Sequence, residues 1–196
     1  MSRTHYFLIC LSILITSCNG QSSPTLKLYN KDFKWTITIP EDFEKVESEQ
    51  WKKMQNKGAE AIEKTYNKEI VNEATVLFVF KSGATNYLEA NYQPFDEKKD
   101  GSYVENWKAV NEVLYHTFQS QMPNAKVDTT TTIEKIDNLD FQKFIMKVAY
   151  PNNMILNILM YSRLIKQKEF TVNIMYVDPK KGEQLLAAWK ASKFDE

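Results

Sequence analysis

The chain of 196 residues is poor in the residue types from which most active sites are built. It contains two histidines, two cysteines and five glycines. One histidine and both cysteines lie within the first 18 residues, which leaves His116 as the imidazole of the folded part. Zinc and copper sites draw mainly on histidine and cysteine, so we expect no metal site and no cofactor. Scarce glycine also argues against a loop that cradles phosphate.

The remaining candidates for catalysis are weak. His116 follows Leu114 by two residues, which places it opposite the apolar stripe of a predicted helix, and we expect it to be solvent-exposed. No G-x-S-x-G elbow is present. The segment from Asp96 to Gly101 has some spacing of a calcium loop, but Lys98 and Trp107 fall at positions that need oxygen ligands. We therefore expect a protein that is not an enzyme, a hydrolase that uses unaligned carboxylates being the least favoured alternative.

The charge of the chain excludes another class of function. Lysine plus arginine and aspartate plus glutamate number 25 each. Removal of the first 17 residues would take away one basic residue, Arg3, so the remainder stays near neutral. Nucleic-acid binders normally carry a clear basic excess, so no nucleic-acid partner is predicted. With no repeat or low-complexity block, residues 26–196 are predicted to form a single domain.

The N-terminal segment has the pattern of a lipoprotein signal. Its apolar run, residues 6–15, is too short for an ordinary transmembrane helix and fits a signal-peptide core. The run ends in Ile15-Thr16-Ser17-Cys18, which resembles the bacterial lipobox. This resemblance implies cleavage before Cys18 and acylation of Cys18, which would hold the protein in a membrane through its acyl chains. The alternative is a secreted protein that is cut near Ser17 and keeps a free thiol.

This interpretation divides the chain into three parts. Residues 1–17 are predicted to be the signal peptide, 18–25 the lipidated cysteine and a short tether, and 26–196 the domain. The expected location is the bacterial cell envelope, facing the periplasm or the outer surface. No acidic run follows Cys18 that would indicate which membrane face the domain occupies.

Three consecutive alternating runs predict an antiparallel β-meander. Each has one apolar face and one mixed face, and they span residues 141–150, 154–165 and 170–177. A slip of one residue would bury Asn157, so the register should pair residue 148 with 156 and 143 with 161. The connection between the first two runs is then a three-residue loop, Pro151-Asn152-Asn153.

The mixed faces of the meander gather the polar side chains that we regard as a candidate site. A second turn of three or five residues would bring Asn173 beside Tyr161 or Arg163. The candidate face then comprises Lys143, Lys147, Asn157, Tyr161, Arg163 and Asn173. One interpretation is that a helix covers this face while the basic groups reach water at its rim. The other is a groove for a partner or an anionic small ligand.

The rest of the domain predicts alternating strands and helices. Further strands are expected at 26–29, 33–39, 75–80, 87–93 and 127–136, the last near a sheet edge. Helices are expected over 48–66, as one helix or two, after the capping pair Ser102 and Glu105, and after Asp178-Pro179. Buried stripes are assigned to Trp107, Val110, Leu114 and Phe118 in the second helix and to Leu185, Leu186 and Trp189 in the third.

This order predicts an α+β protein with a largely antiparallel sheet flanked by helices on both faces. It resembles the PsbP-like α/β/α fold in its opening strand from Trp35 to Pro40, its long helix before the meander, and its closing helix running to Ser192-Lys193-Phe194. That fold is shared by a photosystem subunit, the Ran-binding Mog protein and many bacterial lipoproteins. The resemblance implies a binding module more than an enzyme.

Two functions are therefore expected. The first is a membrane-anchored, non-catalytic module that binds or helps assemble another envelope protein. The second is a carrier or binder of a small amphiphilic or anionic ligand between sheet and helix. A closed interior pocket larger than a few waters would favour the carrier, and an exposed apolar patch without a pocket would favour the partner module.

Overall fold

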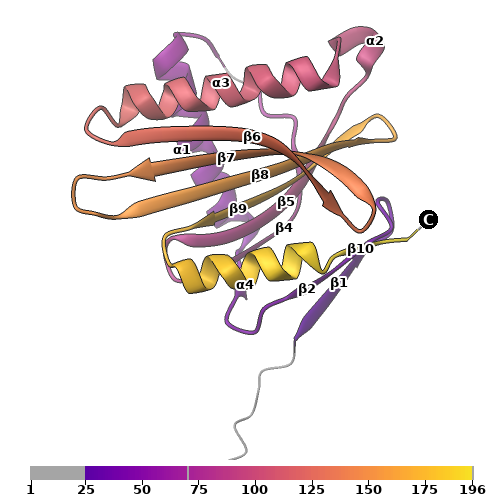
Figure 1. Cartoon of the computed structure of the whole chain (residues 1–196). Coiled ribbons are helices and arrows are strands. Elements are labelled where there is room, and N and C mark those ends of the chain that lie inside the picture. Colours follow the sequence, from indigo (N-terminus) through magenta and orange to yellow (C-terminus); the bar gives the residue numbers. More distant parts are fainter. Residues whose placement is uncertain (1–24, 70, 196) are drawn as a thin grey trace, which may run out of the picture.

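The computed structural model describes residues 25–69 and 71–195, which form two antiparallel sheets and four helices. The larger sheet has seven strands in the order β3-β4-β5-β9-β8-β7-β6 (Figure 1). Its strands are β3 (Glu44–Lys45), β4 (Thr75–Ser82), β5 (Asn86–Pro94), β6 (Lys126–Ile136), β7 (Leu139–Ala149), β8 (Ile155–Ile165) and β9 (Lys168–Tyr176). The expected edge position of the strand at 127–136 is confirmed, because β6 is the last strand of this sheet.

The smaller sheet joins the two ends of the domain. Its order is β1 (Leu26–Asn30), β2 (Trp35–Ile39) and β10 (Lys193–Phe194). The closing residues were expected to end a helix, but Lys193 and Phe194 pair with β2 instead. Phe194 is held there because its ring stacks on Trp35, at 6.2 Å between centroids, and its N–H donates to Asp137 Oδ2 at 2.7 Å.

The described residues form four helices, of which the third and fourth begin where their capping residues predict, while the first has no side-chain cap. They are α1 (Ser48–Tyr66), α2 (Glu97–Asp100), α3 (Tyr103–Gln121) and α4 (Pro179–Lys190). Ser102 Oγ accepts from the N–H of Glu105 at 3.5 Å, and Asp178 Oδ1 accepts from the N–H of Lys180 at 2.9 Å. The segment 48–66 is one helix rather than two. None of the helices in residues 25–69 and 71–195 is long and apolar enough to cross a membrane.

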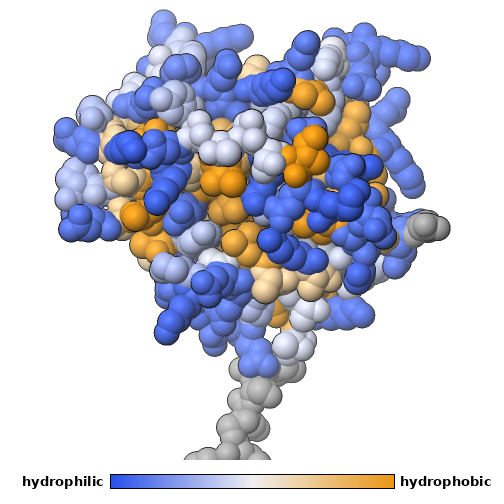
Figure 2. Space-filling model, in the orientation of Figure 1, coloured by the Kyte–Doolittle hydropathy of each residue, from blue (hydrophilic) through white to orange (hydrophobic). Residues whose placement is uncertain are grey.

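The large sheet lies between two layers. Helices α1 and α3 cover one face, and α4 with the small sheet covers the other (Figure 1). Gly182 permits the close approach of α4, since a Cβ at this position would lie 2.5 Å from the ring of Tyr176. The predicted α+β class, with a largely antiparallel sheet flanked on both faces, is confirmed. On the face of the molecule shown in Figure 2, hydrophilic residues predominate and hydrophobic residues form separate patches between them.

Each side of the sheet has its own apolar core. On the α4 side, Trp189 packs edge-on against Trp35 at 6.0 Å between ring centroids and against Phe141 at 5.2 Å. On the other side, Trp107 of α3 is buried against residues of β7 that include Met146. The stripe expected for α3 is wrong at Val110, which is 43% exposed.

The register of the first hairpin of the meander is confirmed. Val148 pairs with Leu156 and Lys143 with Tyr161. The N–H of Tyr150 donates to the carbonyl of Met154 at 2.9 Å, which closes the predicted three-residue loop. Burial of the apolar residues on one face of β7 and β8 fixes this register, as the alternation indicates.

The second turn of the meander differs from the prediction. Ile165 pairs with Lys168, so the turn has two residues, Lys166 and Gln167, with φ of 49° and 60°. Two positive φ values are typical of the type I′ hairpin turn, which normally carries Asn-Gly. The pair Lys-Gln gives no such signal. As a result Asn173 pairs with Met160 and lies on the opposite face of the sheet from Tyr161.

Candidate functional site

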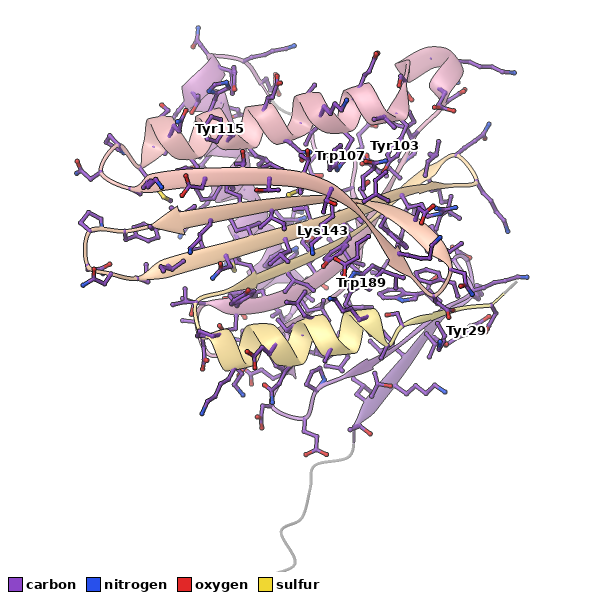
Figure 3. The ribbon with its side chains drawn as sticks, viewed as in Figure 1. Tyr29, Tyr103, Trp107, Tyr115, Lys143 and Trp189 are labelled. Atoms are coloured by element: carbon purple, nitrogen blue, oxygen red, sulfur yellow. The ribbon has the colours of Figure 1, made fainter. Side chains whose placement is uncertain are left out.

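Five of the six candidate residues of the meander share the α4 side of the sheet. Lys143 lies opposite Tyr161 and Lys147 opposite Asn157, while Arg163 follows Tyr161 by two residues on the same strand. Figure 3 shows Lys143 between the strands and α4, above Trp189. Helix α4 covers this face as expected, with the Trp189 ring 5.4 Å from that of Tyr161.

The polar groups of this face bind one another. The carboxylate of Glu134 accepts from Lys143 Nζ at 2.5 Å, from Lys190 Nζ at 3.0 Å and from Tyr161 OH at 3.2 Å. Burial works to raise the pKa of Glu134, but hydrogen bonds from the two lysines outweigh it and hold that pKa below its usual value. Arg163 Nη1 donates to the carbonyl of Asp140 at 2.6 Å. The ion pair between Lys190 and Glu134 connects α4 to β6, so this cluster stabilises the fold.

The remaining predicted residues do not extend the cluster around Glu134. The side chain of Lys147 is exposed and that of Asn157 half-buried. Cys18, the predicted lipidation residue, lies outside the described residues. His116 on α3 is exposed, as expected from its spacing. Among the residues that the structure describes, no group of three or more histidine, cysteine and acidic side chains is placed to hold a metal ion.

The opposite side of the sheet contains a partly enclosed cavity of about 240 Å³ between the strands and helices α1 and α3. Trp51 closes it from α1, and Leu114 and Phe118 close it from α3. Its floor is the sheet, where the lining side chains are Tyr87, Glu89, Met146, Ile158, Met160, Asn173 and Met175. Three methionines give the floor an adaptable apolar surface.

Strand pairing explains why these side chains meet. Glu89 of β5 lies directly opposite Asn173 of β9, which lies opposite Met160 of β8. In the neighbouring row Met175 lies opposite both Tyr87 and Ile158, on its two sides. Residues two apart on a strand share a face, so two adjacent rows from four strands form the floor of one cavity.

Glu89 is the polar centre of this cavity. It is 7% exposed, its Oε1 accepts from Trp51 Nε1 at 3.0 Å, and its Oε2 accepts from Asn173 Nδ2 at 2.9 Å. Burial raises the pKa of this carboxyl above its usual value, against the opposing effect of these hydrogen bonds. None of the cavity-lining residues is a lysine, arginine or histidine. The carboxylate is therefore hydrogen-bonded but not neutralised by a cation.

Asn173 carries an unmet hydrogen-bonding requirement. Its amide nitrogen donates to Glu89, but its buried Oδ1 has no partner among the described residues. A buried acceptor without a donor costs free energy, on the order of 1–3 kcal/mol. The cavity thus has one bonded carboxylate in its lining, held by an amide whose own oxygen is unpartnered.

The sequence did not predict Glu89 as a site residue. It predicted Asn173, but beside Tyr161 or Arg163 rather than opposite Glu89 and Met160. The signal for Glu89 was its place in the strand expected at 87–93, between Leu88 and Ala90, where a carboxylate interrupts a run that is otherwise buried. Buried carboxylates are rare unless paired, and those with shifted pKa values gather at functional sites.

A second buried polar network on this side is fully bonded. Tyr103 OH donates to Ser162 Oγ at 2.8 Å, and Ser162 donates to Glu169 Oε1 at 2.7 Å. Gln93 Nε2 donates to the other carboxylate oxygen at 2.7 Å. Tyr103 and Trp107 both lie between α3 and the sheet in Figure 3. Because its members satisfy one another, this network stabilises the contact of α3 with β8 and leaves no group for a ligand.

Comparison with known proteins identifies the fold. No protein-family model matches the sequence, and no curated protein matches it. The solution structure of cyanobacterial PsbP (CyanoP) from Synechocystis sp. PCC 6803 superposes with a TM-score of 0.56 over 92% of this chain and 99% of that chain. The chain has a PsbP-like fold. The sequence identity is 10%, so the similarity to CyanoP concerns the fold alone.

A crystal structure of a protein from Bacteroides thetaiotaomicron VPI-5482 is also similar. Its TM-score is 0.40 at 10% identity, and the match covers 87% of this chain and 48% of that one. At this level the two chains share general features of strands and helices, and the match adds nothing to the PsbP-like assignment.

Proposed function

We propose that this PsbP-like domain is a non-catalytic binding module of the bacterial cell envelope that holds a small amphiphilic molecule in the Glu89 cavity. The observation that carries the proposal is the cavity itself, about 240 Å³ of mostly apolar space with one buried carboxyl at its floor. Ligand sites are typically apolar cavities with few, well-placed polar groups. The pocket is partly open rather than closed, and its apolar lining supports the carrier more than the partner module.

The protein environment of the cavity supports this function. A buried carboxyl is costly, so its presence in the lining of an apolar pocket calls for a reason. Methionine side chains at its floor can move to fit different apolar shapes. The cavity lies between the sheet and helices α1 and α3.

Binding of an apolar fluorescent probe tests the proposal. N-phenyl-1-naphthylamine should bind saturably, with about one probe per chain, and brighten on entering the cavity. Leu114→Trp fills the cavity from α3 and should abolish this binding. Val110→Trp is the matched control, since Val110 lies on the same helix, is 43% exposed and does not line the cavity. Equal binding by both variants would show that the probe binds elsewhere.

The envelope location and the lipid anchor belong to the same proposal. They rest on the similarity of Ile15-Thr16-Ser17-Cys18 to the lipobox. Acyl chains on Cys18 would keep the domain beside a membrane, which is a reservoir of small amphiphiles. A carrier anchored there could exchange its ligand over a short distance.

An exposed sheet edge favours the partner module as a second candidate. Strand β6 has 11 residues, pairs with β7 alone in the described chain, and exposes 61% of Ile133. An unpaired edge of this length can accept a strand from another protein. Charged side chains protect such edges, so Ile133→Lys should block this mode.

Affinity capture from detergent-solubilised membranes separates the two candidates. A co-purifying envelope protein that is lost from Ile133→Lys and kept by Leu114→Trp would support the partner module. A co-purifying small amphiphile with the reverse pattern would support the carrier.

A further inference from the structure

We infer that the amphiphile carries an ammonium group at its polar end, which binds the carboxylate of Glu89, and that anionic amphiphiles such as fatty acids are rejected. This inference rests on the proposed function and names the ligand class of the same cavity. It replaces the anionic ligand that the lysines and arginine of the meander suggested, because those residues lie on the other face of the sheet.

Charge selects a cation. Glu89 is 7% exposed and no cationic side chain lines the cavity. A second negative charge beside Glu89 would be repelled in a region of low dielectric constant, whereas a positive charge would be attracted there. Tyr87 is the other titratable side chain among the described lining residues, so the lining has no basic group to balance a bound carboxylate or phosphate.

Hydrogen bonding selects a group with several donors and no acceptor. The carboxylate of Glu89 accepts from Trp51 and Asn173, and Asn91 also stabilises its charged form by a hydrogen bond. A carboxylate has about four lone-pair sites, so it retains capacity for a further donor. An ammonium group supplies donors and a positive charge, whereas a hydroxyl group supplies one uncharged donor, so an alcohol should bind more weakly than an amine.

The volume and the apolar lining of the cavity limit the size and character of the ligand's nonpolar part. The cavity of about 240 Å³ is smaller than the roughly 300–1,000 Å³ of sites for drug-sized ligands. Its walls away from Glu89 are the side chains of Leu114, Phe118, Ile158 and the three methionines. A short aliphatic or aromatic body fits this lining. The expected ligand is therefore a small hydrophobic amine.

Three probes with the same chain and different polar ends test the inference. We expect n-octylamine to bind the full-length protein at pH 7 at least about tenfold more tightly than 1-octanol, and octanoate to bind most weakly, as measured by isothermal titration calorimetry. In Glu89→Gln the octylamine affinity should fall to about that of octanol. Glu169→Gln is the matched control, since Glu169 is a second buried carboxylate on this side that does not line the cavity.

The outcomes separate this inference from the proposed function. Octanoate that binds as tightly as octylamine, or octylamine binding that Glu89→Gln leaves unchanged, overturns the ammonium ligand while the cavity keeps its carrier role. Failure of all three probes and of N-phenyl-1-naphthylamine to bind overturns both. The comparison of octylamine with octanoate uses the unaltered protein, so it decides the question even if Glu89→Gln fails to fold.

Discussion

At the scale of single residues, the pKa values of the partly buried Glu134 and the buried Glu89, on opposite sides of the sheet, shift in opposite directions. Glu134 accepts from two lysines and a tyrosine, and its pKa is lowered. Glu89 has no cationic partner, and its pKa is raised by burial. A residue of the first kind stabilises the fold at neutral pH, and one of the second kind costs stability. A binding role for Glu89 would explain why the protein contains a carboxyl that lowers its stability.

The pH dependence of stability should reveal the cost of Glu89. Its pKa in the folded state is raised by burial above the usual value of 4.5, so the folded state holds the proton to higher pH than the unfolded state. Stability is therefore lost as pH rises from about 4.5 through the folded pKa. Glu89→Gln removes this loss and should raise the melting temperature at pH 7, with the gain vanishing at pH 4.

Glu134→Gln is a control of opposite sign. The lowered pKa of Glu134 contributes stability above the unfolded pKa, and this is lost as pH falls through the folded pKa. The variant should melt lower than the unaltered protein at pH 7, and the difference should shrink at low pH. Melting curves at several pH values measure both variants. A Glu89→Gln protein that is less stable at pH 7 would contradict our account of the carboxyl.

At the scale of elements, one tight turn decides which face each residue of β9 occupies. With two residues, Lys166 and Gln167, the turn places Phe170, Val172 and Ile174 on the α4 side. A three-residue turn would exchange the two faces, because side chains alternate along a strand. The pattern of β9 alone cannot show this, since both of its faces are buried or half-buried in the structure.

Replacement of a turn residue by glycine should stabilise the second hairpin. Gln167 has φ of 60°, a conformation that costs an ordinary L-residue about 1–2 kcal/mol and glycine almost nothing. After subtraction of the entropy that glycine gains in the unfolded chain, Gln167→Gly should raise the free energy of unfolding by about 0.5–1 kcal/mol. Urea denaturation measures the change. Gln167→Ala keeps the β-carbon and should give no gain, and equal effects of the two variants would contradict the strain argument.

At the scale of the whole molecule, the domain combines a closed side and a side with a cavity. The α4 side packs four aromatic rings around Trp35, including Phe170 at 5.0 Å and Trp189 at 6.0 Å between centroids. The side of α1 and α3 has two smaller clusters with the Glu89 cavity at their junction. We expect the first side to carry most of the stability and the second to carry the binding function.

Substitution of the predicted lipidation residue tests how the molecule is held at the membrane. Cys18→Ser should leave the domain folded, with unchanged circular dichroism, but release it from membranes or stall its processing. Fractionation of cells into membrane and soluble parts, followed by immunoblotting, measures this. Cys10→Ser is the matched control, because Cys10 lies inside the apolar run. Membrane attachment that survives Cys18→Ser would end the lipoprotein interpretation.

The sequence by itself determined the features that depend on local patterns. Alternation and caps located the longer strands and helices but not the short elements β3, α2 and β10. Burial of one face set the pairing of Lys143 with Tyr161. The PsbP-like arrangement followed from the order of these elements. Local rules suffice here because a strand, a cap or a three-residue loop is fixed by residues close together in the chain.

Only the tertiary structure decided which residues form the candidate site. Glu89 and Asn173 are 84 positions apart, and they meet because β5 pairs with β9 and because the turn before β9, which has no glycine signal, places Asn173 on the same face as Glu89. The separation of β1, β2 and β10 into a sheet of their own likewise depends on Phe194 returning to Trp35. Such contacts follow from packing over the whole chain, where the identity of the neighbour, not the local pattern, sets the free energy.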